Sequence, residues 1–369
     1  MTFISSLIEN KYDYIWKSLI RPPRDNKYTS KDLGQEKFKI NSHNYYRTDF
    51  TLYNKKKQKI ICSFWQPFDE ERILPRLPCI IYLPGNSSSR CEATNIIQYL
   101  LPLNITVFSF DFIGSGKSDG EYISLGYYEK EDVCTVINYL RKSNKVSTIG
   151  LWGRSMGAVT ALLTAEYLYN HKNNFDCDYE ISAIICDSPF QSLNSLINEY
   201  VKKKIKYMLQ IIINFVKKYV SDIVEKKAHF KIDKIDSMKA IKSFSHIPIL
   251  FFHAMNDNFI SVENSKNLYN EYKGKKEIIL FDGNHNSPRP IHIFQVASLF
   301  IYENLDIKNI KIINEKYNKK VYKTIVITNN EEDYVDDIDE KVEDDMNNRC
   351  YTETKCFYVN KKYEFFETI

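Results

Sequence analysis

A short glycine-flanked serine motif limits what this chain can fold into more than any other feature of its sequence. Residues 153–157 read Gly-Arg-Ser-Met-Gly, a match to G-x-S-x-G with Ser155 at its centre. An apolar run from Val146 precedes it, and a helix-forming segment, 158–169, follows. This context predicts a tight strand-to-helix turn that exposes the hydroxyl at the positive end of a helix, as a nucleophile requires. An ordinary serine in a glycine-flanked turn is the alternative interpretation.

The remaining hydrophobic pattern predicts an α/β fold. Continuous apolar runs typical of buried parallel strands occur at 78–83, 105–110, 181–186, 247–253 and 276–281. Predicted helices follow or separate them at 91–101, 127–140, 262–272 and 290–304. Alternating apolar and polar residues at 38–53 and 59–65 predict an antiparallel hairpin. We therefore expect a mostly parallel sheet with an N-terminal antiparallel hairpin and helices on both faces.

A serine nucleophile needs a base beside its hydroxyl and an acid that orients the base, and both should follow later strands. Asp257 and His285 each follow a late predicted strand, in the order Ser, Asp, His. A helix-capping acid and an exposed loop histidine are the alternative interpretations of these two residues. Asp187, which also ends a strand, is a second candidate for the acid. His253, inside a strand end, is expected to be a structural group near the acid.

The developing charge on a substrate oxygen needs two backbone donors, which together form an oxyanion hole. One donor is expected to be the N–H of Met156, directly after the candidate nucleophile. The other is expected in the loop after the strand 78–83, at Asn86. Gly85 would then allow the backbone to approach closely.

These residues resemble the α/β-hydrolase superfamily, in particular its serine-hydrolase branch of monoacylglycerol-lipase-like and S33 aminopeptidase-like enzymes. The resemblance covers roughly residues 38–304 and rests on the segments 83–86, 111–118, 153–157, 187–190, 253–257 and 283–285. It implies Ser155 as nucleophile, His285 as base and Asp257 as orienting acid, with no metal or cofactor required. The usual His-Gly of the oxyanion loop is Pro84-Gly85 here, but the donor is a backbone group and is retained.

The regions around this core suggest a division of the chain into three parts. We expect a helical extension at residues 1–37, the hydrolase domain at 38–304 and a charged, partly disordered tail at 305–369. The tail contains ten acids and one lysine at 331–345. A mostly helical insertion at about 192–244 is expected to form a cap over the site. Its apolar run 207–216, between lysine clusters, could line an acyl pocket, contact a membrane surface or pack as an ordinary cap helix. The N-terminal helix could likewise pack on the domain or lie at a membrane interface.

Composition narrows the class of protein further. The eight cysteines form no C-x-x-C pair and no zinc spacing, which favours a reducing compartment and predicts no metal site. No run approaches the ~20 apolar residues of a transmembrane helix. We expect a cytoplasmic protein with no nucleic-acid partner, and peripheral contact with a membrane is the alternative.

The sequence therefore predicts a serine hydrolase that cleaves a carboxylic ester or thioester, with a lipid-like acyl group favoured, through a Ser-His-Asp triad and an acyl-enzyme. An aminopeptidase-like peptidase is one alternative, and it would need an acidic patch to hold a free amine. A non-catalytic interaction protein on a hydrolase scaffold is the other alternative.

Overall fold

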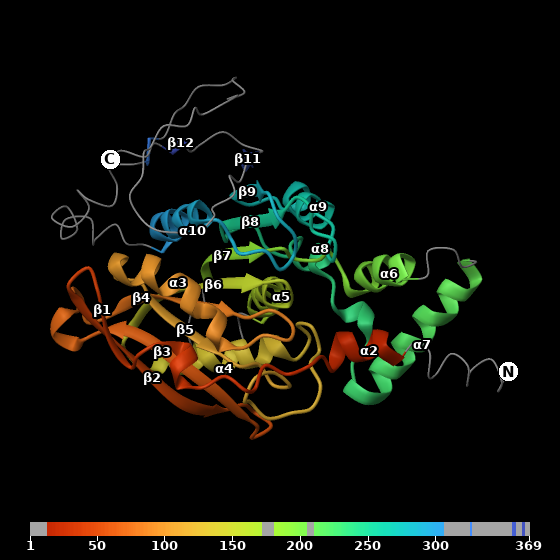
Figure 1. The fold of residues 1–369 in the computed structure, drawn as a ribbon, viewed down its shortest axis with the longest axis horizontal. Coiled ribbons are helices and arrows are strands. Elements are labelled where there is room, and N and C mark those ends of the chain that lie inside the picture. Colours follow the sequence, from red (N-terminus) through yellow and green to blue (C-terminus); the bar gives the residue numbers. More distant parts are fainter. Residues whose placement is uncertain are drawn as a thin grey trace, which may run out of the picture.

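A twisted central sheet organises the chain (Figure 1). The computed structural model describes residues 13–171, 181–204 and 210–305, and three short strand segments beyond them at 325–326, 356–358 and 364–365. The sheet has ten strands in the order β1-β2-β3-β5-β4-β6-β7-β8-β9-β11. These strands are β1 (Lys37–Ile40), β2 (His43–Tyr53), β3 (Lys59–Pro67), β4 (Leu77–Leu83), β5 (Thr106–Phe110), β6 (Val146–Arg154), β7 (Ile181–Asp187), β8 (Ile249–Ala254), β9 (Lys276–Phe281) and β11 (Cys356–Tyr358). A separate antiparallel pair joins β10 (Ile325–Val326) to β12 (Glu364–Phe365).

The strand directions confirm the predicted mostly parallel sheet. All neighbours from β5 through β9 run parallel, whereas β1, β2 and β3 pair antiparallel and β3 joins β5 antiparallel. The expectation of one strand over 38–53 is wrong in one detail. Asn41 and Ser42 adopt positive φ values of 48° and 70°, and this turn divides the segment into β1 and β2. Asparagine tolerates that conformation, so no glycine marks the break.

Helices cover both faces of the sheet and explain why its central strands are apolar throughout. In β4, Cys79 and Ile81 belong to one buried cluster and Ile80 and Tyr82 to the other, because successive side chains point to opposite faces. The first cluster lies under α4 (Glu129–Lys142), α5 (Met156–Asn170), α8 (Ser237–Ala240) and α9 (Glu263–Glu271). The second lies under α3 (Thr94–Leu100) and α10 (Ile291–Asn304).

Three further helices gather on the side toward which β6, β7 and β8 point (Figure 1). They are α2 (Asp13–Ile20), α6 (Leu193–Lys204) and α7 (Gln210–Ala228). The Tyr219 hydroxyl of α7 donates a hydrogen bond to Asp13 of α2 at 2.7 Å, and Lys227 lies over the Trp16 ring. The described part of the N-terminal helix therefore packs on the insertion, with Trp16 and Ile20 buried.

The three-part division of the chain remains a prediction. Residues 1–12, most of the predicted tail with its acidic run, and residues 207–209 of the apolar run lie outside the described residues. The helical content expected for the insertion is present in α6, α7 and α8. Among the helices that the structure describes, none combines the length and apolarity that crossing a bilayer demands.

Candidate active site

Ser155 occupies a strained turn between β6 and α5. Its backbone has φ 51° and ψ −113°, a left-handed conformation that is uncommon for a residue other than glycine. The turn is held by a hydrogen bond from the Ser155 N–H to the Asp187 carbonyl at the end of β7, at 2.7 Å. The strand-to-helix turn predicted from the motif is therefore present, with the serine at its apex.

Both glycines of the motif are required by close backbone contacts. A Cβ added to Gly153 would lie 2.2 Å from the Gly157 carbonyl carbon. One added to Gly157 would lie 1.9 Å from the Leu83 carbonyl oxygen at the end of β4. By contrast, a Cβ at Gly85 would meet nothing nearer than the Arg154 carbonyl oxygen at 3.6 Å, an ordinary contact. The close approach expected at Gly85 is therefore not observed, whereas Gly157 makes such an approach.

Replacing Gly157 with alanine is expected to destabilise the fold by at least about 2 kcal/mol, because backbone atoms must move to admit the methyl group. Urea denaturation measures the change in the free energy of unfolding. The matched control is Gly85→Ala, which adds the same methyl group with no clash and should change stability by less than about 1 kcal/mol. Equal costs at the two positions would contradict the packing described here.

The structure brings the three predicted side chains into one hydrogen-bonded line. The imidazole Nε2 of His285 lies 3.2 Å from the Ser155 Oγ, and its Nδ1 lies 2.6 Å from the Asp257 Oδ2. The other carboxylate oxygen of Asp257 accepts the N–H groups of Phe259 and Ile260, both at 2.8 Å. All three side chains are largely buried in loops that follow β6, β8 and β9. In this line Nδ1 donates to the carboxylate, which leaves Nε2 able to accept a proton from the serine.

The surroundings of Asp257 keep its carboxylate ionised. Burial raises the pKa of Asp257, but contacts with His253 and His285 and the Ile260 N–H outweigh burial and hold the pKa well below its usual range. His253 lies where the sequence suggested, with its Nε2 3.4 Å from the Asp257 Oδ2. Its ring is fixed by Ser265 and by the Ile260 carbonyl, at 2.7 and 2.9 Å. These contacts of His253 therefore support the Asp257 carboxylate.

The predicted oxyanion residues flank Ser155. Met156 is buried and is the first residue of α5, so its N–H belongs to the amides that lack a partner within the helix. The loop after β4 lies against the turn, since a Cβ on Gly85 would be 3.9 Å from the Ser155 Cβ. Asn86 follows in that loop, and its side chain donates to the carbonyls of Ser18 and Leu19, each at 3.3 Å. Assigning Asn86 and Met156 as oxyanion donors remains a proposal.

Comparison with known proteins shows what this chain is similar to. The model of the family described as serine aminopeptidase, S33, matches residues 78–243. A protein of Acanthamoeba polyphaga mimivirus is 29% identical over 60% of this chain and 72% of its own length. Human monoglyceride lipase is 28% identical over 31% of this chain and 37% of its own length. An esterase of Pyrococcus furiosus has the same fold, with a TM-score of 0.57, 21% identity, and coverage of 78% of this chain and 99% of its own.

The chain has the α/β-hydrolase fold. This confirms the fold predicted from the sequence, and the chain is similar to the S33 serine aminopeptidase family and to human monoglyceride lipase, in agreement with the predicted class of serine hydrolase. Several curated relatives are matched over less than two thirds of their length; a Bacillus subtilis relative, 26% identical, is matched over 64%. The substrate and the activity of the whole protein therefore remain proposals.

Four charged residues form hydrogen bonds with the backbone around this line, a role that was not expected from the sequence: Glu92, Arg154, Asp187 and Arg289. Asp187, considered above as a second candidate acid, instead accepts two hydrogen bonds from Arg289, each at 2.8 Å. Burial raises the pKa of Asp187, but Arg289 and Arg154 outweigh burial and hold the pKa below its usual range. The one signal available from the sequence was the position of Asp187 and Arg154 at strand ends.

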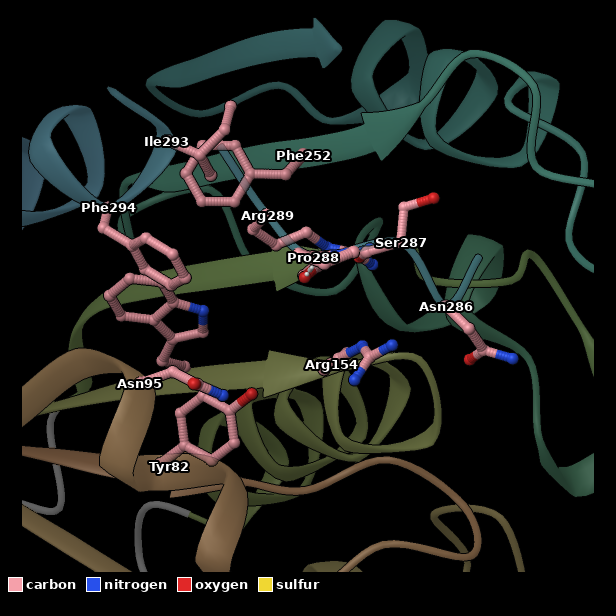
Figure 2. A pocket seen from close by; sticks show the side chains of 12 residues that line it. Tyr82, Asn95, Arg154, Phe252, Asn286, Ser287, Pro288, Arg289, Ile293 and Phe294 are labelled. Atoms are coloured by element: carbon pink, nitrogen blue, oxygen red, sulfur yellow. Dashed lines mark hydrogen bonds and ion pairs between the residues drawn. The ribbon is translucent and has the colours of Figure 1, made fainter. Parts of the chain in front are cut away.

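A cavity of about 220 Å³ lies behind the His285 loop of the hydrolase (Figure 2). Apolar side chains, including Ile293 and Phe294, gather at one end, and Arg154 and Arg289 lie toward the other. None of Ser155, Asp257 and His285 lines it, so it is not the cleft in which a substrate would meet the serine. Within the described ranges, no group of three or more His, Cys, Asp and Glu side chains could hold a metal ion.

Proposed function

We propose that this hydrolase cleaves carboxylic esters or thioesters through Ser155, His285 and Asp257. The observation that carries the proposal is the continuous hydrogen-bonded line from the serine hydroxyl through the imidazole to a buried carboxylate, at 3.2 and 2.6 Å. A serine at a strained strand-to-helix turn, with a base in reach and an acid behind the base, is the arrangement of nucleophilic acyl transfer.

Each group has a defined task in this chemistry. Ser155 Oγ attacks the acyl carbon while His285 Nε2 accepts its proton, and the Asp257 carboxylate stabilises the resulting imidazolium. The N–H groups of Met156 and Asn86 hold the oxyanion as it forms. His285 then gives its proton to the leaving alcohol or thiol, which leaves an acyl group on Ser155. A water molecule, deprotonated by His285, hydrolyses this acyl-enzyme and restores the serine.

An apolar wall beside the base supports a substrate with an apolar acyl or alcohol part. The Phe259 ring lies 5.2 Å from the His285 ring and is 39% exposed. Tyr200 of α6 contacts Phe259 edge-on, with ring centroids 6.2 Å apart. Two aromatic rings at the edge of the site offer apolar surface to an acyl or alcohol group. Human monoglyceride lipase, matched above, carries a lipid ester in its name, which agrees with this preference.

A substrate screen tests the proposal. Esters and thioesters of increasing acyl length, together with aminoacyl amides, are offered to the wild-type protein and to Ser155→Ala. Turnover of esters or thioesters that disappears in the variant is the expected result. Preference for aminoacyl amides would favour the peptidase alternative, which agrees with the description of the matched family as a serine aminopeptidase. A wild-type protein that neither turns over any substrate nor reacts with a fluorophosphonate would favour the non-catalytic alternative.

We further propose that helix α7 contacts anionic membrane surfaces. Ile211 and Phe215, one helical turn apart, are 66% and 57% exposed. Exposed lysines lie nearby in the sequence at Lys218 on α7 and at Lys202 and Lys203 on α6. Apolar side chains that insert between acyl chains, flanked by cations that meet lipid phosphates, are the features of an interfacial helix.

Binding to lipid vesicles measures this contact. Ile211→Asp combined with Phe215→Asp is expected to lower affinity for vesicles of anionic phospholipid by roughly tenfold or more, because the two apolar side chains that would insert between the acyl chains are replaced by charged ones. Tyr53→Asp is the matched control, since Tyr53 is a 59% exposed aromatic residue on β2 and not on α7. Equal binding by the double variant and the control would contradict a membrane role for α7.

A further inference from the structure

We propose that two arginine–carboxylate pairs act as positioning residues that hold the His285 loop in register with Ser155. We call Arg154, Glu92, Arg289 and Asp187 the arginine clamp. The inference rests on the proposed function, because it concerns the placement of the proposed base. The clamp side chains act on the reacting side chains through the backbone, above all through the carbonyl of His285.

Both arginines converge on one atom, the carbonyl oxygen of His285. The Nη2 of Arg154 donates to it at 3.0 Å, and the Nη1 of Arg289 donates at 3.2 Å. Arg289 Nη1 also donates to the Ser287 carbonyl at 2.8 Å. Two guanidinium donors on one carbonyl fix the position of the residue that carries the imidazole, and charged donors bond more strongly than neutral ones.

The Arg289–Asp187 pair joins the base loop to the nucleophile turn. Arg289 donates to both carboxylate oxygens of Asp187 in a bidentate pair, and both side chains are less than a tenth exposed. The Asp187 carbonyl accepts the N–H of Ser155 at 2.7 Å. A single residue at the end of β7 therefore holds Ser155 by its backbone and the His285 loop by its side chain.

The Arg154–Glu92 pair joins the same loop to the proposed oxyanion loop. Arg154, directly before the nucleophile, donates to the Glu92 carboxylate at 2.5 Å. The other oxygen of that carboxylate accepts the N–H of Gly85 at 3.0 Å. Gly85 directly precedes Asn86, so one connected set of hydrogen bonds reaches the base, the nucleophile turn and a proposed oxyanion donor.

The His285 loop depends on the hydrogen bonds of the arginine clamp, because side chains do not fill the space behind the loop. The 220 Å³ cavity lies against residues 286–289, and both arginines line it (Figure 2). The loop has no helix or strand of its own between β9 and α10. Where packed atoms are missing, directional hydrogen bonds remain to set the backbone. A shift of about 1 Å at a reacting group can cost on the order of a hundredfold in rate.

Three clamp variants test the inference: Arg289→Gln, Asp187→Asn and Arg289→Lys. Arg289→Gln and Asp187→Asn are expected to lower kcat by about 10- to 100-fold with KM changed less than about threefold, because substrate contacts remain while the base moves. Arg289→Lys keeps one charged donor and should recover part of the loss. Circular dichroism and thermal melting confirm folding of each variant, and Arg289→Lys serves if Arg289→Gln does not fold.

A matched control separates positioning from general loss of stability. Arg72 is a partly buried arginine whose guanidinium holds the Lys145 carbonyl at 2.9 Å, beside the start of β6 and far from Ser155. Arg72→Gln removes the same kind of bond and should leave kcat within about twofold. A kcat loss in Arg72→Gln equal to that in Arg289→Gln would overturn the inference.

A double variant provides the decisive readout. If Arg289 acts through His285, then Arg289→Gln should cost nothing further in a His285→Ala background, measured as the rate of residual labelling by a fluorophosphonate. If Arg289→Gln still lowers the labelling rate in the His285→Ala background, or if it changes KM rather than kcat in the wild-type background, the positioning role is overturned. Failure of the proposed function is distinct from these outcomes, because wild-type protein would then show no Ser155-dependent labelling at all.

Discussion

Replacing Ser155 with alanine is expected to lower kcat for the best ester substrate by about a millionfold, with little change in KM. The alanine removes the only oxygen in the hydrogen-bonded line that can attack a carbonyl, while leaving the apolar wall at Phe259 in place. No acyl-enzyme can then form, and turnover falls to what a water molecule in the same pocket achieves. Steady-state kinetics with purified variant, checked for trace wild type by active-site titration, measures the loss.

The companion variant His285→Ala sharpens this prediction. Because the serine and the imidazole act as one unit, the double variant Ser155→Ala/His285→Ala should be no slower than either single variant. Losses that multiply in the double variant would show that the two residues act independently. In that case the 3.2 Å contact between them would not be the basis of catalysis.

Asp257→Asn is expected to lower kcat by about 10⁴-fold. An asparagine amide at this position can donate to Nδ1 of His285, which would place the imidazole proton on Nε2, facing the serine that must give up its own proton. Circular dichroism at neutral pH should show a folded variant, with a melting temperature below that of the wild type because the stabilising carboxylate is lost. A variant within tenfold of wild-type kcat would assign the orienting acid to another residue.

Acidification tests the same carboxylate through stability. The pKa of Asp257 lies below its usual range in the folded protein, so its contribution to stability is present above the unfolded-state pKa of about 3.9. That contribution disappears as pH falls through the folded pKa. The difference in melting temperature between wild type and Asp257→Asn should therefore shrink as pH is lowered below about 4. A difference that stays constant from neutral to strongly acidic pH would contradict the low pKa.

The proposed catalytic line could be predicted because its parts sit at positions that the sequence marks. Ser155 lies between two glycines that only a tight turn needs, and Asp257 and His285 each follow a continuous apolar run that reads as a buried strand. In a parallel sheet the ends of such strands meet at one edge, so residues more than a hundred positions apart converge without any further information.

The arginine clamp could not be predicted in the same way. Nothing in the local sequence marks Glu92 or Arg289 as the partner of a particular charged residue, and which charged side chains will pair depends on the exact path of the folded backbone. The turn at Asn41 and Ser42 was not predicted for a related reason. Asparagine can adopt a positive φ, but it is also common in other conformations, so its presence alone does not indicate a turn. The local sequence pattern was enough to predict where the strands end. The contacts between loops could be identified only in the folded structure.

The position of α2 has a practical consequence for anyone who shortens the protein. This helix offers its Ser18 and Leu19 carbonyls to Asn86 and its Asp13 carboxylate to Tyr219 of α7. A truncation that begins at the first strand of the sheet would remove both anchors at once. Cloning boundaries, affinity tags and protease sites therefore belong upstream of Asp13, and a preparation trimmed past it would report on an altered enzyme.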